Sequence, residues 1–288
     1  MKVWIEGEIV EGAQARIPVT DHGLLYGDGI FEGLRVYAGA IFRLPDHLRR
    51  LGAAARALGI EIPGGLAGVE EILLATARAY GRPEAYIRLL VTRGDGALGV
   101  DPTSCESPRI VCIVDEVRLY SESKQRSGID LVTSSLRRPS PDVLDPRIKS
   151  LNYLNSVLAK REARLRGADE ALLLNAAGCV AEASVANVFC VRRGVLRTPP
   201  ATDGALEGIT RASLLEIAEA MALPYRVETL GRFDLFDAEE VFLSGTGARI
   251  VPVATLDGQA IGRTGGRPVT ERLSGAFSDF TKDHGTTL

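Results

Sequence analysis

The sequence predicts an α+β protein built from two domains. The chain has 288 residues, it mixes strand and helix patterns irregularly, and one polar stretch interrupts it near the middle. A chain of this length is comfortable for two domains of ordinary size. Strands and helices do not alternate as regular βαβ units, so an α+β arrangement is favoured over a doubly wound parallel sheet.

The composition is that of a soluble globular protein, with 45% apolar and 25% charged residues. The 34 basic and 37 acidic side chains give a net charge of −3, and no basic arm or acidic tail stands out. Nucleic acid and membrane lipid are therefore not expected as partners. The first residues lack the pattern of a signal peptide, and no run of 18 apolar residues occurs. We expect a cytoplasmic protein.

The first predicted domain is a small α+β unit over residues 1–118. Its expected elements are an antiparallel meander over 1–45, helices at 46–59 and 66–80, and strands at 85–93 and 109–117. The polar stretch 119–128 has almost no apolar content and is the predicted interdomain linker.

The second predicted domain, the larger one, covers residues 129–288. Its expected helices lie at 150–166 and 209–222, and its expected strands at 129–135, 170–174, 180–198 (folding back at 192–194), 225–229, 239–243 and 249–256. The leucines 151, 154, 158 and 165 are expected to form the apolar face of the first helix.

Three common kinds of site are not supported by the local sequence. Gly94–Gly99 matches the dinucleotide pattern G-x-G-x-x-G after a strand, but Pro102 and Pro108 forbid the helix that such a site needs. We therefore expect a flexible loop there. The four cysteines and three histidines follow no metal-ligand spacing, so no metal is predicted, and there is no G-x-S-x-G motif of a serine hydrolase.

Lys149 is the first candidate for chemistry. It directly precedes the helix expected from Ser150 onward, where the helix dipole disfavours a positive charge. A neutral amine at this position could attack an aldehyde. By position alone, a solvated lysine beside a helix start is the more common alternative.

Glu182 is the second candidate, because it lies in an otherwise apolar or small run over 178–191. A carboxylate buried there needs a partner, and a protonated pyridine nitrogen is one that would suit it. A glutamate at a solvent-facing strand edge is the equally plausible alternative.

Three segments could hold a phosphate. Gly208 precedes a helix, so the amides of Ile209 and Thr210 could bind an anion, and Ser244–Gly247 forms a second turn rich in amides around Thr246. In the helix 46–59, Arg49 and Arg50 both flank the apolar face, and helical geometry slightly favours Arg50.

In the strand at 85–93, the period of two places Tyr86 and Arg88 on one face, with Ile87 and Leu89 on the other. An arginine beside a tyrosine on an interior face suits recognition of a carboxylate. An exposed strand face would fit the fragment equally well.

These fragments, in this order, resemble the fold-type IV pyridoxal phosphate enzymes, and most of all the branched-chain amino acid aminotransferases. The similar segments are 26–35, 47–51, 148–153, 182–187, 206–210 and 245–247, so the resemblance covers residues 1–262. It implies a small α/β domain and a larger domain with a pseudo-barrel sheet. It also implies a homodimer or higher homo-oligomer, with pyridoxal 5′-phosphate between the domains.

The resemblance implies a role for each candidate. Lys149 would form the Schiff base, and Glu182 would pair with the pyridine nitrogen. Arg50, Ile209, Thr210 and Thr246 would hold the phosphate, and Tyr153 the ring oxygen, although the spacing from lysine to tyrosine is one residue shorter than in many relatives. The residues implied for the substrate are Tyr26, Phe31, Gly33, Tyr86, Arg88 and Gly247, with Leu98 and Val100 reaching the neighbouring subunit's pocket.

The activity implied is transamination between a branched-chain or other hydrophobic L-amino acid and 2-oxoglutarate. D-amino acid aminotransferases, (R)-selective amine transaminases and aminodeoxychorismate lyases share the scaffold and are the alternatives. Gly247 stands where alanine is common and Arg249 where an acidic residue is frequent, which bears on how a second carboxylate is held. An alternative outside the enzymes is a catalytically idle protein that binds the cofactor or serves as a scaffold. The presence of both Lys149 and Glu182 argues against this alternative.

Overall fold

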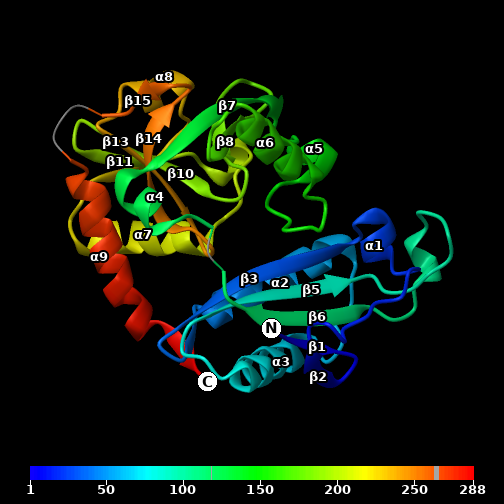
Figure 1. Ribbon diagram of the computed structural model, residues 1–288. Coiled ribbons are helices and arrows are strands. Elements are labelled where there is room, and N and C mark those ends of the chain that lie inside the picture. Colours follow the sequence, from blue (N-terminus) through cyan, green and yellow to red (C-terminus); the bar gives the residue numbers. More distant parts are fainter. Residues whose placement is uncertain (118, 263–265) are drawn as a thin grey trace. The chain divides into compact units, whose positions relative to one another are not determined.

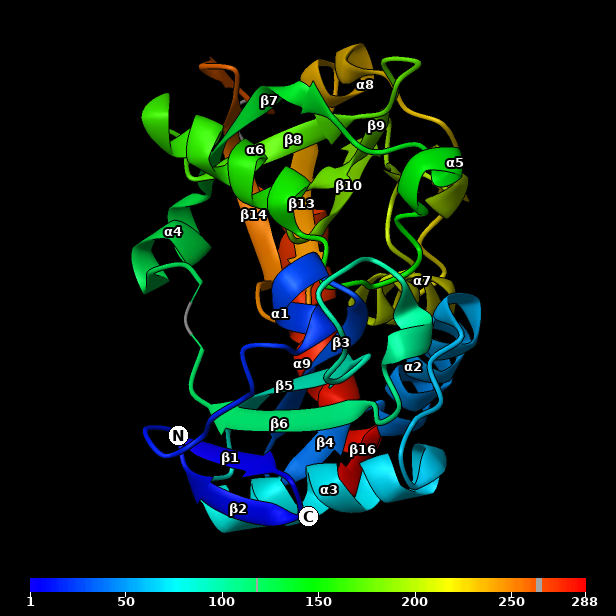
Figure 2. The same ribbon diagram turned by 90° about the vertical axis from the view of Figure 1, so that its right-hand side faces the viewer.

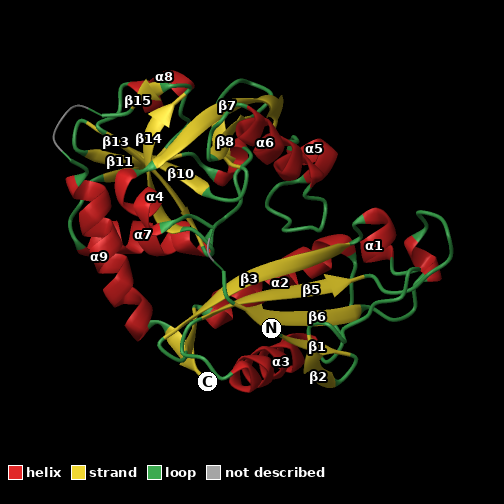
Figure 3. Ribbon diagram, in the orientation of Figure 1, coloured by secondary structure: helices red, strands yellow, loops and turns green. Residues whose placement is uncertain are grey.

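The computed structural model describes residues 1–117, 119–262 and 266–288. The chain forms two compact units, each a β-sheet with packed helices, as Figures 1 and 3 show. Unit 1 comprises Met1–Val117, Ile148–Asn152 and Thr281–Leu288, and unit 2 comprises Arg118–Arg147 and Tyr153–Phe280. The predicted α+β class is confirmed. Two short segments, 148–152 and 281–288, are assigned to unit 1, whereas the predicted boundaries placed them in the large domain.

Unit 1 contains a seven-stranded sheet in the order β16-β4-β3-β5-β6-β1-β2 (Figure 2). Its strands are β1 (Lys2–Ile5), β2 (Glu8–Glu11), β3 (Gly29–Tyr37), β4 (Ala40–Phe42), β5 (Ala85–Thr92), β6 (Arg109–Asp115) and β16 (Gly285–Thr287). Every neighbouring pair is antiparallel. Such a sheet can bury one face under helices and leave the other for a different use.

Helices α2 (Leu44–Leu58) and α3 (Gly65–Tyr80) pack on one face of this sheet, close to their predicted bounds. The shared core joins helical side chains such as Leu51 and Leu73 to strand side chains such as Leu34, Ile87 and Cys112. The short helix α1 (His22–Tyr26) was not predicted. Asp21 caps it by accepting a hydrogen bond from the amide of Gly23.

Unit 2 contains a nine-stranded mixed sheet in the order β12-β11-β10-β13-β14-β7-β8-β9, with β15 paired to β14. Its strands are β7 (Ile129–Arg137), β8 (Glu170–Leu174), β9 (Val180–Ala183), β10 (Asn187–Arg192), β11 (Val195–Thr198), β12 (Tyr225–Val227), β13 (Glu240–Gly245), β14 (Arg249–Leu256) and β15 (Gln259–Ala260). Residues 184–186 connect β9 directly to β10, and the amide of Ala183 bonds to the carbonyl of Ala186. The sheet therefore curls back on itself.

The helices of unit 2 are mostly short. They are α4 (Glu122–Ser127), α5 (Pro141–Leu144), α6 (Leu154–Leu165), α7 (Ile209–Ala220), α8 (Arg232–Phe236) and α9 (Pro268–Asp283), the last of which ends in unit 1. Helix α4 lies within the stretch expected to be a linker. Helix α9 was not predicted, and Glu240 binds its first amides, at Val269 and Thr270. No helix among the described residues has both the length and the apolarity to cross a bilayer.

Two local predictions in unit 2 were wrong. Helix α6 begins at Leu154 rather than Ser150, and its leucines, including Leu158 and Leu165, are exposed, whereas Ala159 and Ala163 are buried against β7 and β8. Small residues allow the helix to approach the sheet closely, and the leucine period did not reveal this. The strand expected over 180–198 is also interrupted, because residues 184–186 form a turn between β9 and β10.

Candidate active site

Lys149 lies in unit 1, where its backbone runs beside β3. The amide of Phe31 donates to the carbonyl of Lys149, and the amide of Leu151 donates to the carbonyl of Gly29, both at 2.9 Å. The expected effect of a helix dipole on Lys149 was wrong, because the helix starts only at Leu154 and the dipole field falls off within a turn. The lysine is instead positioned by sheet-like hydrogen bonds.

The face of the sheet opposite the helices carries four of the predicted substrate residues. Phe31 and Gly33 lie two residues apart on β3 and therefore share a face. Gly33 pairs in register with Arg88 on β5, and Arg88 shares this face with Tyr86, which lies two residues before it. The guanidinium carbon of Arg88 lies 4.5 Å from the centroid of the Phe31 ring and 5.5 Å from that of Tyr86. The amine of Lys149 lies 4.3 Å from the same Phe31 centroid. One aromatic ring thus contacts both cations.

Gly33 is required by the position of Tyr86. A Cβ atom built on Gly33 would overlap the hydroxyl oxygen of Tyr86. The glycine therefore allows the tyrosine to lie across β3. The predicted sharing of one face by Tyr86 and Arg88 agrees with the strand register.

The helix-side face of β3 carries an ionic group that the sequence did not reveal. Glu32 accepts hydrogen bonds from Arg50 Nε at 2.8 Å and Arg50 Nη2 at 2.7 Å, and it lies 2.7 Å from His47 Nδ1. Arg50 has a side chain only 13% exposed, whereas that of Arg49 is 76% exposed. Arg50 is therefore the inward-facing arginine of the pair. The feature of the sequence that could have indicated this ionic group is a glutamate, Glu32, within an otherwise apolar strand.

The charge states in this group follow from burial and from its neighbours. Burial opposes ionisation of Glu32, but Arg50 and His47 outweigh it and hold the pKa of the carboxyl well below its usual range. Burial lowers the pKa of His47; Glu32 raises it, and the charges of Arg50 and Lys149 lower it further. At neutral pH the group is therefore a carboxylate, a guanidinium and a neutral imidazole.

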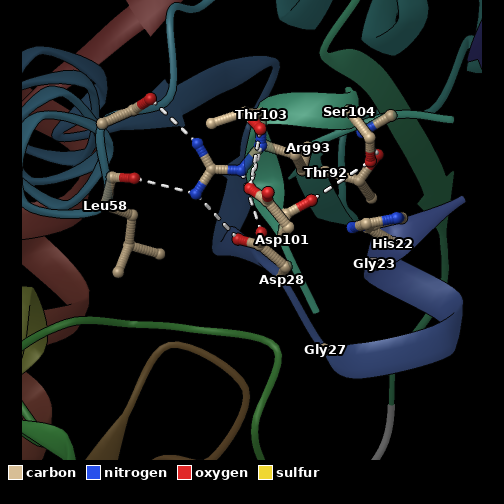
Figure 4. A network of polar contacts seen from close by, with 12 residues as sticks. His22, Gly23, Gly27, Asp28, Leu58, Thr92, Arg93, Asp101, Thr103 and Ser104 are labelled. Atoms are coloured by element: carbon tan, nitrogen blue, oxygen red, sulfur yellow. Dashed lines mark hydrogen bonds and ion pairs between the residues drawn. The ribbon is translucent and has the colours of Figure 1, made fainter. Parts of the chain in front are cut away.

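The glycine-containing loop after β5 is attached firmly at its base. Figure 4 shows Arg93 binding the carboxylate of Asp28 and the carbonyl of Leu58. As expected, the loop forms no helix that could support a dinucleotide site, only a single 3₁₀ turn at Pro102–Ser104.

Further along the loop, the amide of Gly99 donates to the hydroxyl of Tyr26 at 2.8 Å, and His22 Nε2 lies 3.0 Å from the carbonyl of Ala97. Leu98 and Val100, on either side of Gly99, are 82% and 81% exposed. Two apolar side chains are thus held outward on a loop with fixed backbone contacts.

In unit 2, Glu182 is buried, which decides between the two alternatives that the sequence left open, and its carboxylate has partners that the sequence did not reveal. Oε1 forms an ion pair of 2.5 Å with Arg138 Nη2. Oε2 accepts from the amide of Leu206 at 3.0 Å and from Asn187 Nδ2 at 3.2 Å. Asn187 belongs to the next strand, because the turn 184–186 separates it from Glu182. Arg137 and Arg138 are adjacent in the sequence, and their sequence context does not indicate that Arg138 is the one that forms an ion pair with Glu182.

The two predicted phosphate turns also lie in unit 2. Gly208 is the N-cap of α7, and Ile209 and Thr210, both buried, are its first residues. Amides of a first helical turn have no acceptor within the helix, and the dipole favours an anion there. A Cβ atom on Gly208 would overlap Oδ1 of Asn187, so this turn and the surroundings of Glu182 are packed together.

The second turn connects β13 to β14 and contains Thr246 and Gly247. Arg249, at its end, has a left-handed backbone with φ of 58°. A Cβ on Gly247 would meet the side chain of Leu119 at 2.8 Å. Tyr153 precedes α6 and lines a cavity of about 300 Å³ in unit 2. The predicted residues of unit 2 therefore fall on strand β9, on two turns and at one helix start.

Comparison with known proteins defines the class. The chain belongs to the class IV aminotransferases, whose family pattern it matches over residues 29–256. It is 44% identical to a putative branched-chain-amino-acid aminotransferase of Methanocaldococcus jannaschii, over 97% of this chain and 96% of that protein. The family resemblance seen in the sequence is confirmed.

Solved structures give the same result. The branched-chain amino acid aminotransferase of Escherichia coli is similar with a TM-score of 0.93 and 33% identity, over 99% of this chain and 95% of that one. Another branched-chain amino acid aminotransferase, from T.th., complexed with N-(5′-phosphopyridoxyl)-L-glutamate, is similar with a TM-score of 0.92 and 37% identity, over 98% and 94%. The fold expected from the family is therefore confirmed.

Proposed function

We propose that the protein is a pyridoxal phosphate-dependent aminotransferase that acts on branched-chain amino acids. The observation that carries this proposal is the position of the Lys149 amine at the Phe31 ring, on the face that also holds Arg88. An amine, an apolar wall and a guanidinium are the groups needed to react with, accommodate and orient an amino acid with an apolar side chain. The family and its branched-chain relatives support the same activity.

The residues present fit the cofactor. Pyridoxal phosphate supplies an aldehyde that reacts with amines and a ring that withdraws electrons from the substrate's α-carbon. Lys149 provides an amine on a backbone that is fixed by hydrogen bonds. Glu182 provides a buried carboxylate, and the start of α7 provides amides suited to a phosphate.

Each residue then has a distinct task. Lys149 would hold the cofactor through its amine and would take up the proton that leaves Cα of the amino acid. Glu182 would accept a hydrogen bond from the pyridine nitrogen and keep it protonated, and Tyr153 would bind the ring oxygen. The groups that would hold the phosphate are Arg50, Ile209, Thr210 and Thr246.

The substrate is recognised by two kinds of contact. Phe31, Gly33 and Tyr26 surround the side chain, while Tyr86, Arg88 and the turn at Gly247 bind the carboxylate. Leu98 and Val100 serve the pocket of a second copy in a homodimer, which their exposure on an anchored loop supports. The homodimer and the cytoplasmic location remain predictions.

The amino acceptor proposed is 2-oxoglutarate. A solved relative bound to a phosphopyridoxyl derivative of L-glutamate supports this choice, because L-glutamate is the product that 2-oxoglutarate gives. Arg249 lies at the end of the turn containing Gly247 and is a candidate to bind the second carboxylate of this acid.

The test is a half-reaction with single amino donors. The holoenzyme is mixed separately with L-leucine, D-alanine and (R)-1-phenylethylamine, and the absorbance of the bound cofactor is followed. L-leucine should convert the aldehyde form to the amine form, and 2-oxoglutarate should restore it. Conversion by D-alanine alone would show a D-amino acid aminotransferase, and conversion by the (R)-amine alone would show an (R)-selective amine transaminase. If no donor converts the cofactor, the proposed aminotransferase activity is wrong.

A further inference from the structure

Glu32 is a charged residue in an apolar setting. It is 1% exposed and lies on the face of β3 that also carries Ile30 and Leu34, under helix α2. Burying an ionised carboxylate is costly unless charged hydrogen-bond donors surround it. Its position therefore requires an explanation beyond packing.

Arg50 supplies that compensation in one specific geometry. Its Nε and Nη2 atoms face the two carboxylate oxygens of Glu32, at 2.8 and 2.7 Å. A guanidinium is planar and has five N–H donors, so engaging the Nε–Nη2 edge fixes the plane and leaves the Nη1–Nη2 edge facing away from Glu32. The orientation of Arg50 is thus set by Glu32.

His47 completes the arrangement without adding charge. A carboxylate only accepts hydrogen bonds, so the Nδ1 of His47, 2.7 Å from Oε2, carries the proton and donates it. The imidazole is buried, and Arg50 and Lys149 both disfavour its protonation. His47 therefore stabilises Glu32 in place while Glu32 and Arg50 remain an ion pair of one negative and one positive charge.

We infer that Glu32 is a positioning residue for the cofactor phosphate, which it serves by orienting Arg50 with the help of His47. This inference rests on the proposed function, in which Arg50 binds that phosphate. A long, flexible arginine normally loses side-chain freedom when it binds an anion, and this loss weakens binding. Here Glu32 fixes the guanidinium in the chain before any anion is bound, so binding requires less ordering.

The experiment separates phosphate recognition from general stability. Full-length apoprotein is titrated with pyridoxal phosphate and with pyridoxal, which lacks the phosphate, and both affinities are measured by equilibrium dialysis. The ratio of the two affinities reports the contribution of the phosphate alone. The variants are Glu32→Gln, Arg50→Ala, and the double variant. Glu84→Gln is the matched control, because Glu84 makes a surface contact with Arg35 and is half exposed.

Glu32→Gln should lower the preference for pyridoxal phosphate over pyridoxal by about tenfold or more, the size expected when a charge-assisted hydrogen bond is lost. Arg50→Ala should lower it at least as much, and the double variant should lose little more than Arg50→Ala, because both act through one guanidinium. Glu84→Gln should leave the preference unchanged.

The possible failures are distinguishable. If Arg50→Ala lowers the preference and Glu32→Gln does not, Glu32 is only a structural partner and the inference fails while the proposed function stands. If Arg50→Ala also has no effect, the phosphate role proposed for Arg50 fails as well. If Glu32→Gln does not fold, His47→Ala provides the test, because it removes one bond to Glu32 and keeps the ion pair. It should lower the preference by about threefold, and an unchanged preference would overturn the inference.

Discussion

The amide of Phe31 donates a hydrogen bond of 2.9 Å to the carbonyl of Lys149, and the amine of Lys149 lies 4.3 Å from the centroid of the ring of the same phenylalanine. The backbone bond fixes the lysine to β3, and the ring contact orients its side chain over the sheet. The proposed nucleophile is therefore attached to the strand that also carries residues proposed to recognise substrate. Rigid elements hold reacting groups more accurately than loops do.

Lys149 should be the lysine that reacts with the cofactor. Borohydride reduction of the holoenzyme should place the pyridoxyl group on Lys149, and not on Lys2, Lys124, Lys160 or Lys282, as checked by peptide mass analysis. Lys149→Ala should lose the absorbance of the covalent link and at least about 10²-fold in turnover, the lower end of what a general base contributes. Lys2→Ala, which removes a surface contact with Glu11, is the control. Normal turnover in Lys149→Ala would refute its role.

Gly33→Ala should weaken binding of the amino donor. The new methyl group would overlap the hydroxyl of Tyr86, and overpacking of this kind costs about 1–3 kcal/mol. We expect KM for L-leucine to rise by about tenfold, since 1.4 kcal/mol corresponds to that factor. Tyr86→Phe removes the hydroxyl, so Gly33→Ala should raise KM less in the Tyr86→Phe background than in the unchanged protein. An equal rise in both backgrounds would show that the clash is not the cause.

Gly208→Ala should disturb unit 2 at the start of α7. Its Cβ would overlap Asn187 Oδ1, and Asn187 is buried and donates to both Glu182 and the carbonyl of Leu206. We expect affinity for pyridoxal phosphate to fall by about tenfold as the turn shifts. Gly231→Ala is the matched control, because Gly231 also caps a helix and its Cβ would meet only ordinary contact. Equal effects of the two variants would contradict the proposed mechanism of the loss.

Lowering the pH should reduce the difference in the free energy of unfolding between the unchanged protein and the Glu32→Gln variant. The pKa of Glu32 is lowered in the folded state from 4.5, so its contribution is present above about pH 4.5 and is lost as the pH falls towards the folded-state value. At pH 7 the variant should be less stable by about 3–5 kcal/mol, as when one partner of a buried pair is removed.

Urea unfolding at pH 7, 5.5, 4 and 3 measures this difference. His47 also destabilises the fold as the pH falls below 6.5, because its pKa is lowered in the folded state. Glu32 raises this pKa, so the His47 effect is larger in Glu32→Gln, and the expected fall in the difference is therefore read below pH 4.5, where Glu32 itself titrates. Glu84→Gln controls for loss of a surface carboxylate. A difference that stays constant down to pH 3 would show that Glu32 is not ionised in the way the ion pair requires.

Local patterns predicted much of the fold and part of the site. Alternation along β3 and β5 is a property of each strand, so the shared face of Tyr86 and Arg88 could be predicted from the sequence alone. Helix α2 has a clear apolar period, which favours Arg50 over Arg49 as the inward-facing arginine, and Arg50 is the less exposed of the two. Such features depend on residues that are neighbours in the chain.

What could not be predicted depends on partners that are distant in sequence. Glu32 needs His47 and Arg50 from helix α2, and Glu182 needs Arg138 from the loop that follows β7. The helix expected at Ser150 was displaced because residues beside it pair with β3 instead. Backbone hydrogen bonds of this kind can be made by almost any residue, so they leave no mark on the sequence.

The return of residues 148–152 to unit 1 affects how this protein could be recombined with a relative. A crossover after Val117 would take Lys149 from the donor of unit 2, together with Glu182, and would leave Phe31, Tyr86 and Arg88 from the donor of unit 1. Because main-chain atoms make the joining bonds, the foreign segment could dock on β3 without matching side chains. The reactive amine and the residues proposed to select the substrate could thus be inherited from different parents.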